Sequence, residues 1–216
     1  MGADLYDKDF NGRLKKFGKT LHSSLFDLST TTHPGTYYLA ENPELYEIQR
    51  TNNFTFYTSG LSRKINVEGD ALASKDADDI IELSVSKASV PHFSQQAIQV
   101  KRGNNTVKFA GVPEFKSGSI TVNDYVGANT KEILMAWQQK SYNVDTEKVG
   151  LAKDYKIDAY LVEYTPDYQV VRTWKLVGCW ISEISEDEFN HETNDKHTIQ
   201  VTIEYDKAFI DKSSIE

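Results

Sequence analysis

The polar stretch from Ser185 to Lys196 holds the densest group of side chains that could do chemistry. It contains five acids and one histidine, and a second histidine, His197, follows it directly. Carboxylates work as acid–base groups where they converge in a pocket, and paired histidines bind a metal when they lie four residues apart on a helix. His191 and His197 are six residues apart in a segment without helical periodicity. The pattern therefore favours a solvated loop between two strands.

No other chemical motif stands out. The sequence has no glycine-rich phosphate loop, no G-x-S-x-G, no H-E-x-x-H and no C-x-x-C. The single cysteine, Cys179, lies in an apolar, strand-like run and is predicted to be a core residue. We therefore expect no catalytic residue, no cofactor and no bound metal, and an enzyme is the least favoured class.

Composition limits the partners that the chain can have. Hydrophobic residues make up 39% of it and aromatic residues 12%, which is enough for a buried core. The net charge of −8 disfavours a protein that grips nucleic acid by neutralising phosphates. No signal peptide and no apolar run of about 18 residues is visible, and one cysteine permits no internal disulfide. We expect a protein made inside the cell, without a membrane partner.

Residues 1–50 differ from the rest and are predicted to form an irregular N-terminal extension to a β domain at 51–216. Glycine and proline punctuate them, as in the turn-like segment Ser29–Gly35. Apolar residues between Leu14 and Leu28 recur at helical spacings of three and four. Two interpretations are open: an arm that lies on its own domain, or an arm that docks on a neighbouring subunit. We expect contact with neighbouring subunits.

From Phe54 onward the dominant period is two, which is typical of β-strands. Gly103 begins a predicted hairpin turn, and Gly178 is a predicted bend in a long strand. Strands are predicted at 54–60, 80–90, 96–102, 106–111, 117–125, 155–164, 168–184 and 196–206. The polar faces of two of these strands are Glu82, Ser84 and Ser86 in the second, and Thr198, Gln200, Thr202 and Glu204 in the last.

One amphipathic helix is predicted over residues 130–142. Asn129 and Glu132 form a pair like a capping box at its start, and Asn143 is the expected cap at its end. A shared helix face, made of Ile133, Leu134 and Trp137, must cover a sheet. The predicted fold class is mainly β: an antiparallel β-sandwich or barrel of two packed sheets with one flanking α-helix, plus the N-terminal extension.

The order of these elements resembles that of the tail tube proteins of contractile-tailed bacteriophages, which are related to type VI secretion tube proteins. The resemblance extends over about residues 54–209. Gly178-Cys179-Trp180 departs from it, because members of that family often have proline after the small residue of the long strand. The segments that carry the resemblance are FAGVPEFKSGSITVNDY (Phe109–Tyr125), EILMAWQQKSYN (Glu132–Asn143), Tyr155–Ser185 and HTIQVTIEYD (His197–Asp206).

The resemblance implies a structural subunit and no enzyme. In that family six subunits form a ring, their inner sheets join into one barrel, and stacked rings form a tube that carries the genome into the host. It implies contacts with the tail sheath, baseplate and tail terminator proteins, and double-stranded DNA that passes through the lumen without specific binding. The expected location is the tail tube of the virion, after synthesis in the cytoplasm of the host bacterium.

Two polar faces are candidates for the lining of such a channel, where acidic side chains would repel DNA phosphates. They consist of Glu82, Ser84 and Ser86, and of Gln200, Thr202 and Glu204. Other interpretations stay open. The chain could be the tube subunit of a secretion or contractile injection system, a baseplate tube initiator, or a β-sandwich module that binds carbohydrate or a host surface.

Overall fold

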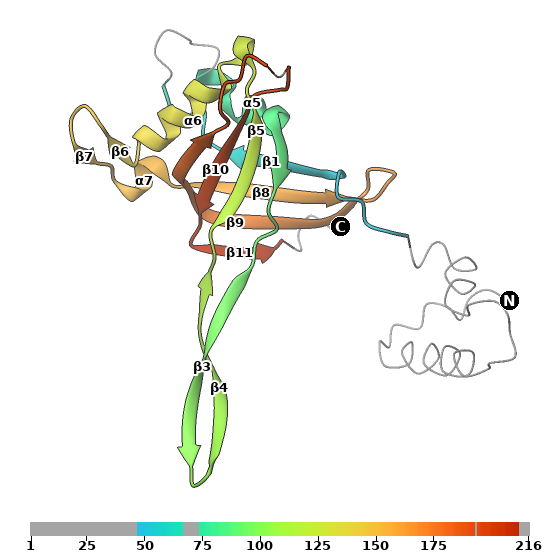
Figure 1. Ribbon diagram of the computed structural model, residues 1–216, viewed down its shortest axis with the longest axis vertical. Helices are drawn as coiled ribbons and strands as arrows, with labels where there is room; N and C mark the ends of the chain where they lie inside the picture. Colours follow the sequence, from blue (N-terminus) through green and yellow to red (C-terminus); the bar gives the residue numbers. More distant parts are fainter. Residues whose placement is uncertain (1–46, 67–73, 193, 212–216) are drawn as a thin grey trace, which may run out of the picture. The chain divides into compact units, whose positions relative to one another are not determined.

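A computed structural model describes residues 47–66, 74–192 and 194–211 (Figure 1). Most of the predicted extension at 1–50, with its expected contact to neighbouring subunits, lies outside these residues. The described strands are β1 (Phe54–Ser59), β2 (Val85–Ala88), β3 (Phe93–Arg102), β4 (Asn105–Phe115), β5 (Gly118–Asn123), β6 (Tyr142–Asn143), β7 (Lys148–Val149), β8 (Ile157–Tyr164), β9 (Val170–Glu186), β10 (Thr198–Glu204) and β11 (Lys207–Ile210). The helices are α5 (Ala77–Ser84), the 3₁₀ turn η2 (Val126–Ala128), α6 (Thr130–Gln139) and α7 (Ala152–Tyr155).

Seven strands form one antiparallel sheet in the order β1-β8-β9-β10-β5-β2, with β11 beside β9. The long strand β9 serves both halves of this sheet. Its residues up to Cys179 pair with β8, and its C-terminal part, Trp180–Glu186, pairs with β10. We call β1, β8, the N-terminal part of β9 and β11 the first layer, and the C-terminal part of β9, β10, β5 and β2 the second layer. The strands of the two layers run in different directions (Figure 1).

The bend predicted at Gly178 lies where β9 passes from one layer to the other. Gly178 has a φ of +72°, a conformation that residues with a Cβ rarely adopt. A Cβ built there would lie 2.4 Å from an Asp206 carboxylate oxygen. That carboxylate also accepts hydrogen bonds from Lys156 Nζ at 2.7 and 2.8 Å. The positive φ therefore favours glycine at this bend, and any side chain there would also have to displace the Asp206 carboxylate.

The core lies between the inner faces of the two layers and is closed by helices. Alternation along β10 turns Ile199, Val201 and Ile203 inward, each 2% exposed or less. On α6 the predicted face is buried, with Ile133 and Leu134 at 0% and Trp137 at 1% exposure. The mainly β fold of packed antiparallel sheets is confirmed. It has one more long helix than expected, because α5 also packs on this core.

The strand predicted at 80–90 is wrong in its first half, where α5 forms instead. Apolar alternation at Ile81 and Leu83 suggested a strand, yet Leu83 is 79% exposed. The buried positions of α5 are Ala77, Ile81 and Ser84, which follow helical spacing. The helical face could not be recognised from the sequence because one of its buried residues, Ser84, is polar. Its hydroxyl donates to the Ile80 carbonyl at 2.6 Å and lies 3.4 Å from the Thr130 hydroxyl.

Asn129 is the N-cap residue of α6, as predicted, but it does not cap in the expected way, and the predicted C-terminal cap is wrong. Asn129 lies at the start of the helix but adopts a left-handed conformation, with φ 50° and ψ 42°, and makes no side-chain capping hydrogen bond. A capping side chain needs an extended backbone, whereas Asn129 joins α6 directly to η2. At the other end, α6 stops at Gln139, and Asn143 belongs to the short strand β6.

Asp78 fastens the start of α5 to the end of β1. Its carboxylate accepts hydrogen bonds of 2.5–3.0 Å from the Thr58 hydroxyl, the Leu61 amide, and the amide and hydroxyl of Ser62. Burial alone would raise the pKa of the Asp78 carboxyl, but these hydrogen bonds outweigh it and lower the pKa. The ionised carboxylate therefore holds α5 in place.

We predict an acid-dependent loss of stability at this site. Because the folded-state pKa of Asp78 is depressed, its contribution is present above the ordinary carboxyl pKa of 3.8 and is lost as the pH falls through the folded-state value. Asp78→Asn should cost about 1.5 kcal/mol at neutral pH and should lose this acid dependence. Urea unfolding from pH 7 to 3 measures both effects, with Asp79→Asn as the control. Equal acid sensitivity of Asp78→Asn and the parent protein would contradict the assignment.

A second prediction concerns Trp137, which lies on the buried face of α6 and donates its indole N–H to the Tyr155 carbonyl at 2.9 Å. Trp137→Ala should lower the free energy of unfolding by about 3–5 kcal/mol, as for other buried aromatic truncations. Met135→Ala on the same helix is the control, because Met135 is 43% exposed. Chemical denaturation measures the difference. A loss below about 1 kcal/mol for Trp137→Ala would show that α6 does not close the core.

Candidate assembly surfaces

The outer face of the second layer is built from small polar side chains. Cross-strand register sets them in two rows, each running from β5 through β10 to β9. The inward neighbours on the same strands are apolar and buried, so the alternation separates core from surface along each strand. The rows are Ser119–Thr202–Glu183 and Thr121–Gln200–Ser185. We call these six residues the polar wall.

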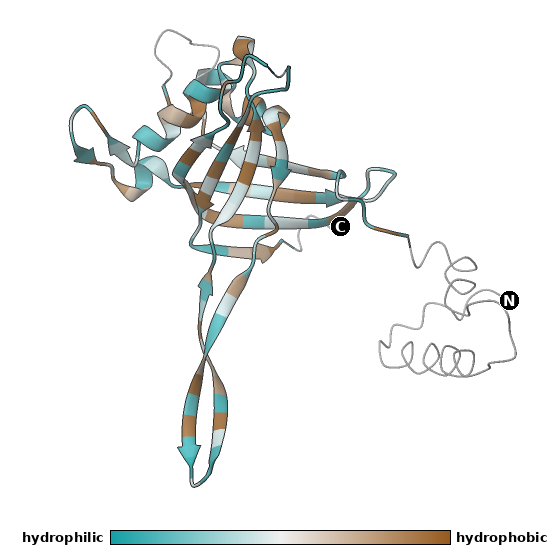
Figure 2. Cartoon of the chain, in the orientation of Figure 1, coloured by the Kyte–Doolittle hydropathy of each residue, from teal (hydrophilic) through white to brown (hydrophobic). Residues whose placement is uncertain are grey.

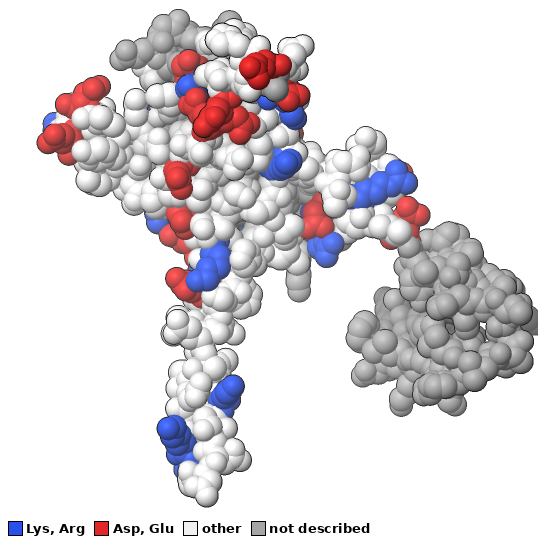
Figure 3. Space-filling view, in the orientation of Figure 1, with Lys and Arg blue, Asp and Glu red and all other residues white. Residues whose placement is uncertain are grey.

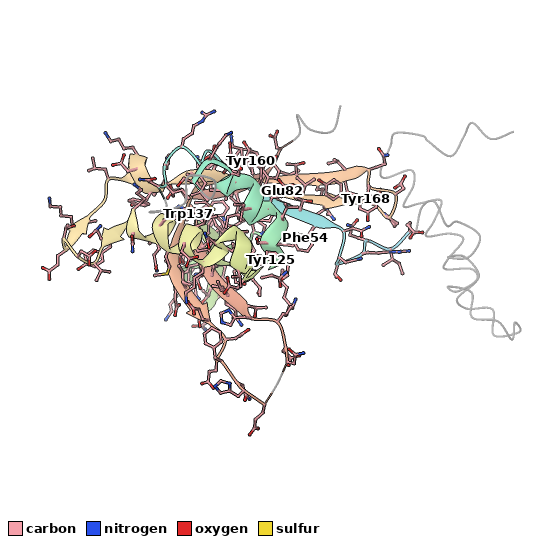
Figure 4. The ribbon with its side chains drawn as sticks, turned by 90° about the horizontal axis from the view of Figure 1, so that it is seen from above. Phe54, Glu82, Tyr125, Trp137, Tyr160 and Tyr168 are labelled. Atoms are coloured by element: carbon pink, nitrogen blue, oxygen red, sulfur yellow. The ribbon has the colours of Figure 1, made fainter. Side chains whose placement is uncertain are left out.

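The structure places the predicted channel residues in three different settings. Gln200 and Thr202 lie in the polar wall, and Glu204 continues the same strand opposite Trp180. Ser86 occupies an irregularity of β2 and donates its hydroxyl to the Thr121 carbonyl at 3.1 Å. Glu82 lies on α5, on which Figure 4 looks down, and its exposed side chain belongs to a helix and to no strand face.

Ser84 is excluded from any channel lining, since its side chain is buried at 1% exposure between α5 and α6. The grouping of Glu82, Ser84 and Ser86 on one strand face was therefore wrong. It failed because the chain is helical up to Ser84. The residues of the polar wall that sequence reasoning missed are Ser119, Thr121, Glu183 and Ser185.

Both edges of the second layer are open within the described residues. β2 pairs with β5 on one side only, and the C-terminal part of β9 pairs only with β10. Such edges present unpaired backbone N–H and C=O groups, which template pairing with another chain. The polar wall therefore lies between two strands that can each accept a further strand.

The hairpin formed by β3 and β4 extends from the second layer away from the core (Figure 1). It continues β2 and β5, as the bonds Ser89 N to Ser119 O and Lys116 N to His92 O show. Register makes one of its faces apolar, because Ile98 pairs with Phe109 and Val100 with Val107. These four side chains are 42–56% exposed. Figure 2 shows the resulting alternation of hydrophobic and hydrophilic residues.

A β-bulge sets the course of this hairpin. Between the pairs Gln95–Pro113 and Ala97–Ala110, β4 has one residue more than β3. A Cβ on Gly111 would lie 2.2 Å from the Gln96 carbonyl oxygen, so the bulge requires glycine there. Ser94, Ile98 and their neighbours line an open surface pocket of about 330 Å³ at this point.

The polar stretch after β9 is a loop, as predicted, between Glu186 and Thr198. His197 fastens it: the ring stacks on Phe189 with a centroid separation of 4.6 Å, and Nδ1 lies 3.1 Å from an Asp124 carboxylate oxygen. In the described part of the chain, no three His, Cys, Asp or Glu side chains are placed to hold a metal. Burial raises the pKa of the Cys179 thiol to about 12, so that group stays protonated and unreactive.

Comparison with known families identifies the family of the chain that carries these surfaces. The family model described as T4-like virus tail tube protein gp19 matches residues 59–208, more than two thirds of the chain. The chain belongs to this family. It is a structural subunit of a tail tube, and the resemblance noted in the sequence is confirmed. A search of curated proteins finds no match.

Solved structures share the fold of this tail tube protein at low sequence identity. The sheath–tube complex of an extracellular contractile injection system, PVC, has a TM-score of 0.55 and 14% identity, over 84% of this chain and 99% of that one. The PVC sheath/tube terminator gives 0.54 and 16%, over 77% and 97%. The tube-terminating cap of the anti-feeding prophage gives 0.53 and 13%, over 76% and 91%. Within the described residues of this chain, no helix is long and apolar enough to cross a bilayer.

The apolar face of the hairpin is predicted to be an assembly contact of the tube. An isolated two-stranded hairpin is marginally stable in water, so its exposed apolar face needs a partner. Ile98→Ser with Phe109→Ser should leave the free energy of unfolding within about 0.5 kcal/mol of the parent value, because neither side chain is in the core. Tube formation, measured by sedimentation, should fall at least tenfold.

Val144→Ser is the control for this double variant, since Val144 is 71% exposed but lies outside the hairpin. It should assemble as the parent chain does. Unchanged sedimentation of the double variant would show that the hairpin face is not needed for assembly.

Proposed function

We propose that this chain forms six-membered rings in which the open edges of the second layers join, and that the stacked rings conduct the phage genome through a lumen lined by the polar wall. The observation that carries the proposal is the position of the polar wall between two unpaired strand edges. Pairing β2 of one copy with the C-terminal part of β9 of the next would satisfy both edges. Repetition around a ring then leaves no edge open.

The size of such a ring supports this reading. Six copies of a four-stranded layer, with strands about 4.8 Å apart, give a circumference of about 115 Å and a backbone diameter of about 37 Å. Strand tilt widens the barrel further. After the side chains are added, the bore still admits a nucleic-acid duplex. A ring of fewer copies would have a proportionally smaller backbone diameter.

The chemistry of the polar wall suits a conduit. Four of its six residues are serine or threonine, and Glu183 carries its only charge. Lys87 lies beside Thr121 on β2, and Glu204 adds a second acid further along β10. A wall with few cations cannot hold phosphates by counterion release, so DNA would slide along it without specific binding.

Membership of the family supports the remaining features of the proposal. The chain acts without catalysis and without a cofactor. It is made in the cytoplasm of the host bacterium and becomes part of the virion, where its tube meets the sheath, the baseplate and the tail terminator. The fold shared with tubes and terminators of contractile injection systems supports these partners.

Cysteine labelling tests the lumen assignment. Cys179 is fully buried and gives no background, so Gln200→Cys supplies one reactive thiol on the polar wall. A small maleimide should label this variant in monomers and in assembled tubes. A maleimide carrying a large polyethylene glycol chain should label monomers but react at least tenfold more slowly with tubes, since it cannot enter the bore. Equal rates of reaction with the large reagent in both states would place Gln200 on the outside.

A further inference from the structure

Each open edge of the second layer carries one charged residue on the face of the polar wall. On β2, Lys87 lies opposite Thr121 and so continues the row Thr121–Gln200–Ser185. On the C-terminal part of β9, Glu183 ends the other row. Both charged side chains are exposed. The wall residues between them on β5 and β10 are uncharged, so the wall presents a cation at one edge and an acid at the other.

Neither charge finds its counterpart within one copy. In the described part of the chain, no ion pair includes Lys87 or Glu183. β2 and β9 are the outer strands of the four-stranded layer, so about 14 Å separates them at about 4.8 Å per strand spacing. On the face of the body that Figure 3 shows, charged side chains lie among larger areas of uncharged residues. A second copy can supply the missing counterpart.

The two charges discriminate between the ways in which the open edges can pair. Two β2 edges would bring Lys87 of one copy near Lys87 of the other, and two β9 edges would do the same for Glu183. Like charges directly opposite on neighbouring strands destabilise a sheet, whereas opposite charges stabilise it. An edge lysine is also a common guard against unwanted strand pairing. Pairing β2 with β9 is the combination that brings unlike charges together.

Strand direction and register allow the two residues to meet. Consecutive strands of the layer are antiparallel, so β2 meets β9 of the next copy antiparallel when all copies of a ring point the same way. A closed barrel needs stagger, so the seam does not continue the row of Lys87 straight to Ser185. Stagger by two residues keeps each side chain on its face, and towards the start of β9 it sets Lys87 opposite Glu183. The opposite step would pass Glu186, where β9 ends.

The inward side chains of the two edges support the same seam. Val85 and Ala88 on β2 and Ile184 on β9 pack against the core but are only partly buried. Joining the edges would cover these side chains and continue the apolar core from one copy to the next. A shift by one residue would instead turn Lys87 towards that core. Burial and charge therefore select the same pairing.

We propose that Lys87 of one copy forms an ion pair with Glu183 of the next, and that this pair selects the union of β2 with β9 over the two self-pairings. The inference rests on the proposed ring and names the residues that specify its seam. A self-paired edge gives an isologous dimer, whereas the unlike pair is heterologous and repeats around a ring. The pair also neutralises Lys87, which would otherwise offer a cation to phosphates in the lumen.

Charge reversal tests this selection. Lys87→Glu opposes two acids at every seam and Glu183→Lys opposes two cations, so each should raise the protein concentration needed for tube formation about tenfold in sedimentation. The variant with both changes restores unlike charges and should assemble within about threefold of the parent concentration. Lys148→Glu on β7 is the control, because this exposed cation lies outside the second layer. Circular dichroism and thermal unfolding confirm that each variant is folded.

Mixing the two single variants is a second test of the same pair. Copies with Lys87→Glu and copies with Glu183→Lys assemble poorly alone, but in alternation they place unlike charges at every seam. Alternation closes in a ring with an even number of copies, as in the proposed six-membered ring. An equimolar mixture should therefore form tubes at a concentration at which neither variant does.

Cysteine cross-linking tests the register in assembled tubes. Cys179 is buried, so Lys87→Cys with Glu183→Cys supplies the two reactive thiols. These positions on one copy are too far apart for a disulfide, so every bridge joins different copies. Mild oxidation should give a ladder of covalent oligomers that ends at six. Lys87→Cys with Ser185→Cys is the matched control and should cross-link about tenfold more slowly, because diagonal positions lie farther apart.

Each outcome decides the proposal. Loss in both single variants, recovery in the double variant and in the mixture, and the expected ladder support it. Normal assembly of either single variant overturns the pairing but leaves the proposed ring standing, as does loss without recovery or faster cross-linking at Ser185. Tubes in which neither cysteine pair cross-links would show that the edges do not join, which overturns the pairing and the proposed ring together. A parent chain that stays monomeric at every concentration would do the same.

Discussion

The fold depends on one strand that changes partners. β9 begins in the first layer beside β8 and β11 and ends in the second layer beside β10, and the change occurs next to Gly178. Gly178 has a left-handed backbone that residues with a Cβ rarely adopt, and the Asp206 carboxylate lies against it. Because both layers grow from β9, this bend fixes how their inner faces meet. It also frees the C-terminal part of β9 as an edge.

That free edge connects the fold of one chain to the assembly. A sandwich of two separate sheets usually protects its edges by closure, by charge or by a covering segment. In the described residues, neither the C-terminal part of β9 nor β2 has a further strand on its outer side, so the second layer is not closed. The hairpin adds a second incomplete feature, an apolar face without a core beneath it. The isolated chain thus has a packed core, but it leaves two strand edges unpaired and one apolar hairpin face exposed, and other copies can cover these surfaces.

Sequence reasoning worked where periodicity and burial agree. β10 alternates strictly, so both of its faces were predicted, and α6 has an apolar face long enough to be recognised. It failed where the two disagree. In α5 a buried serine and an exposed leucine reversed the apparent pattern, and at Asn129 a preceding 3₁₀ turn removed the backbone that a cap requires. Side-chain types alone reveal neither the reversed burial in α5 nor the 3₁₀ turn before Asn129.

The assembly surfaces were harder to predict for a different reason. The alternation of Ile98, Val100, Val107 and Phe109 predicts a strand pair but does not show that nothing in the same chain covers it. Likewise Glu183 and Ser185 read as part of a long strand, and only register across β10 aligns them with Thr202 and Gln200. An uncovered face and a cross-strand alignment are properties of tertiary structure, since they depend on which strands are neighbours in the sheet and which lie at its edge.

A reconstruction of assembled tubes by electron cryomicroscopy tests the central claim most directly, because it shows which backbone segments meet between neighbours in a ring. The account predicts that β2 of one copy lies about 4.7–4.9 Å from the C-terminal part of β9 of the next, in a continuous hydrogen-bonded wall whose inner surface carries Gln200 and Thr202. A ring in which these two edges lie apart, and neighbours meet only through side chains of other surfaces, would contradict it.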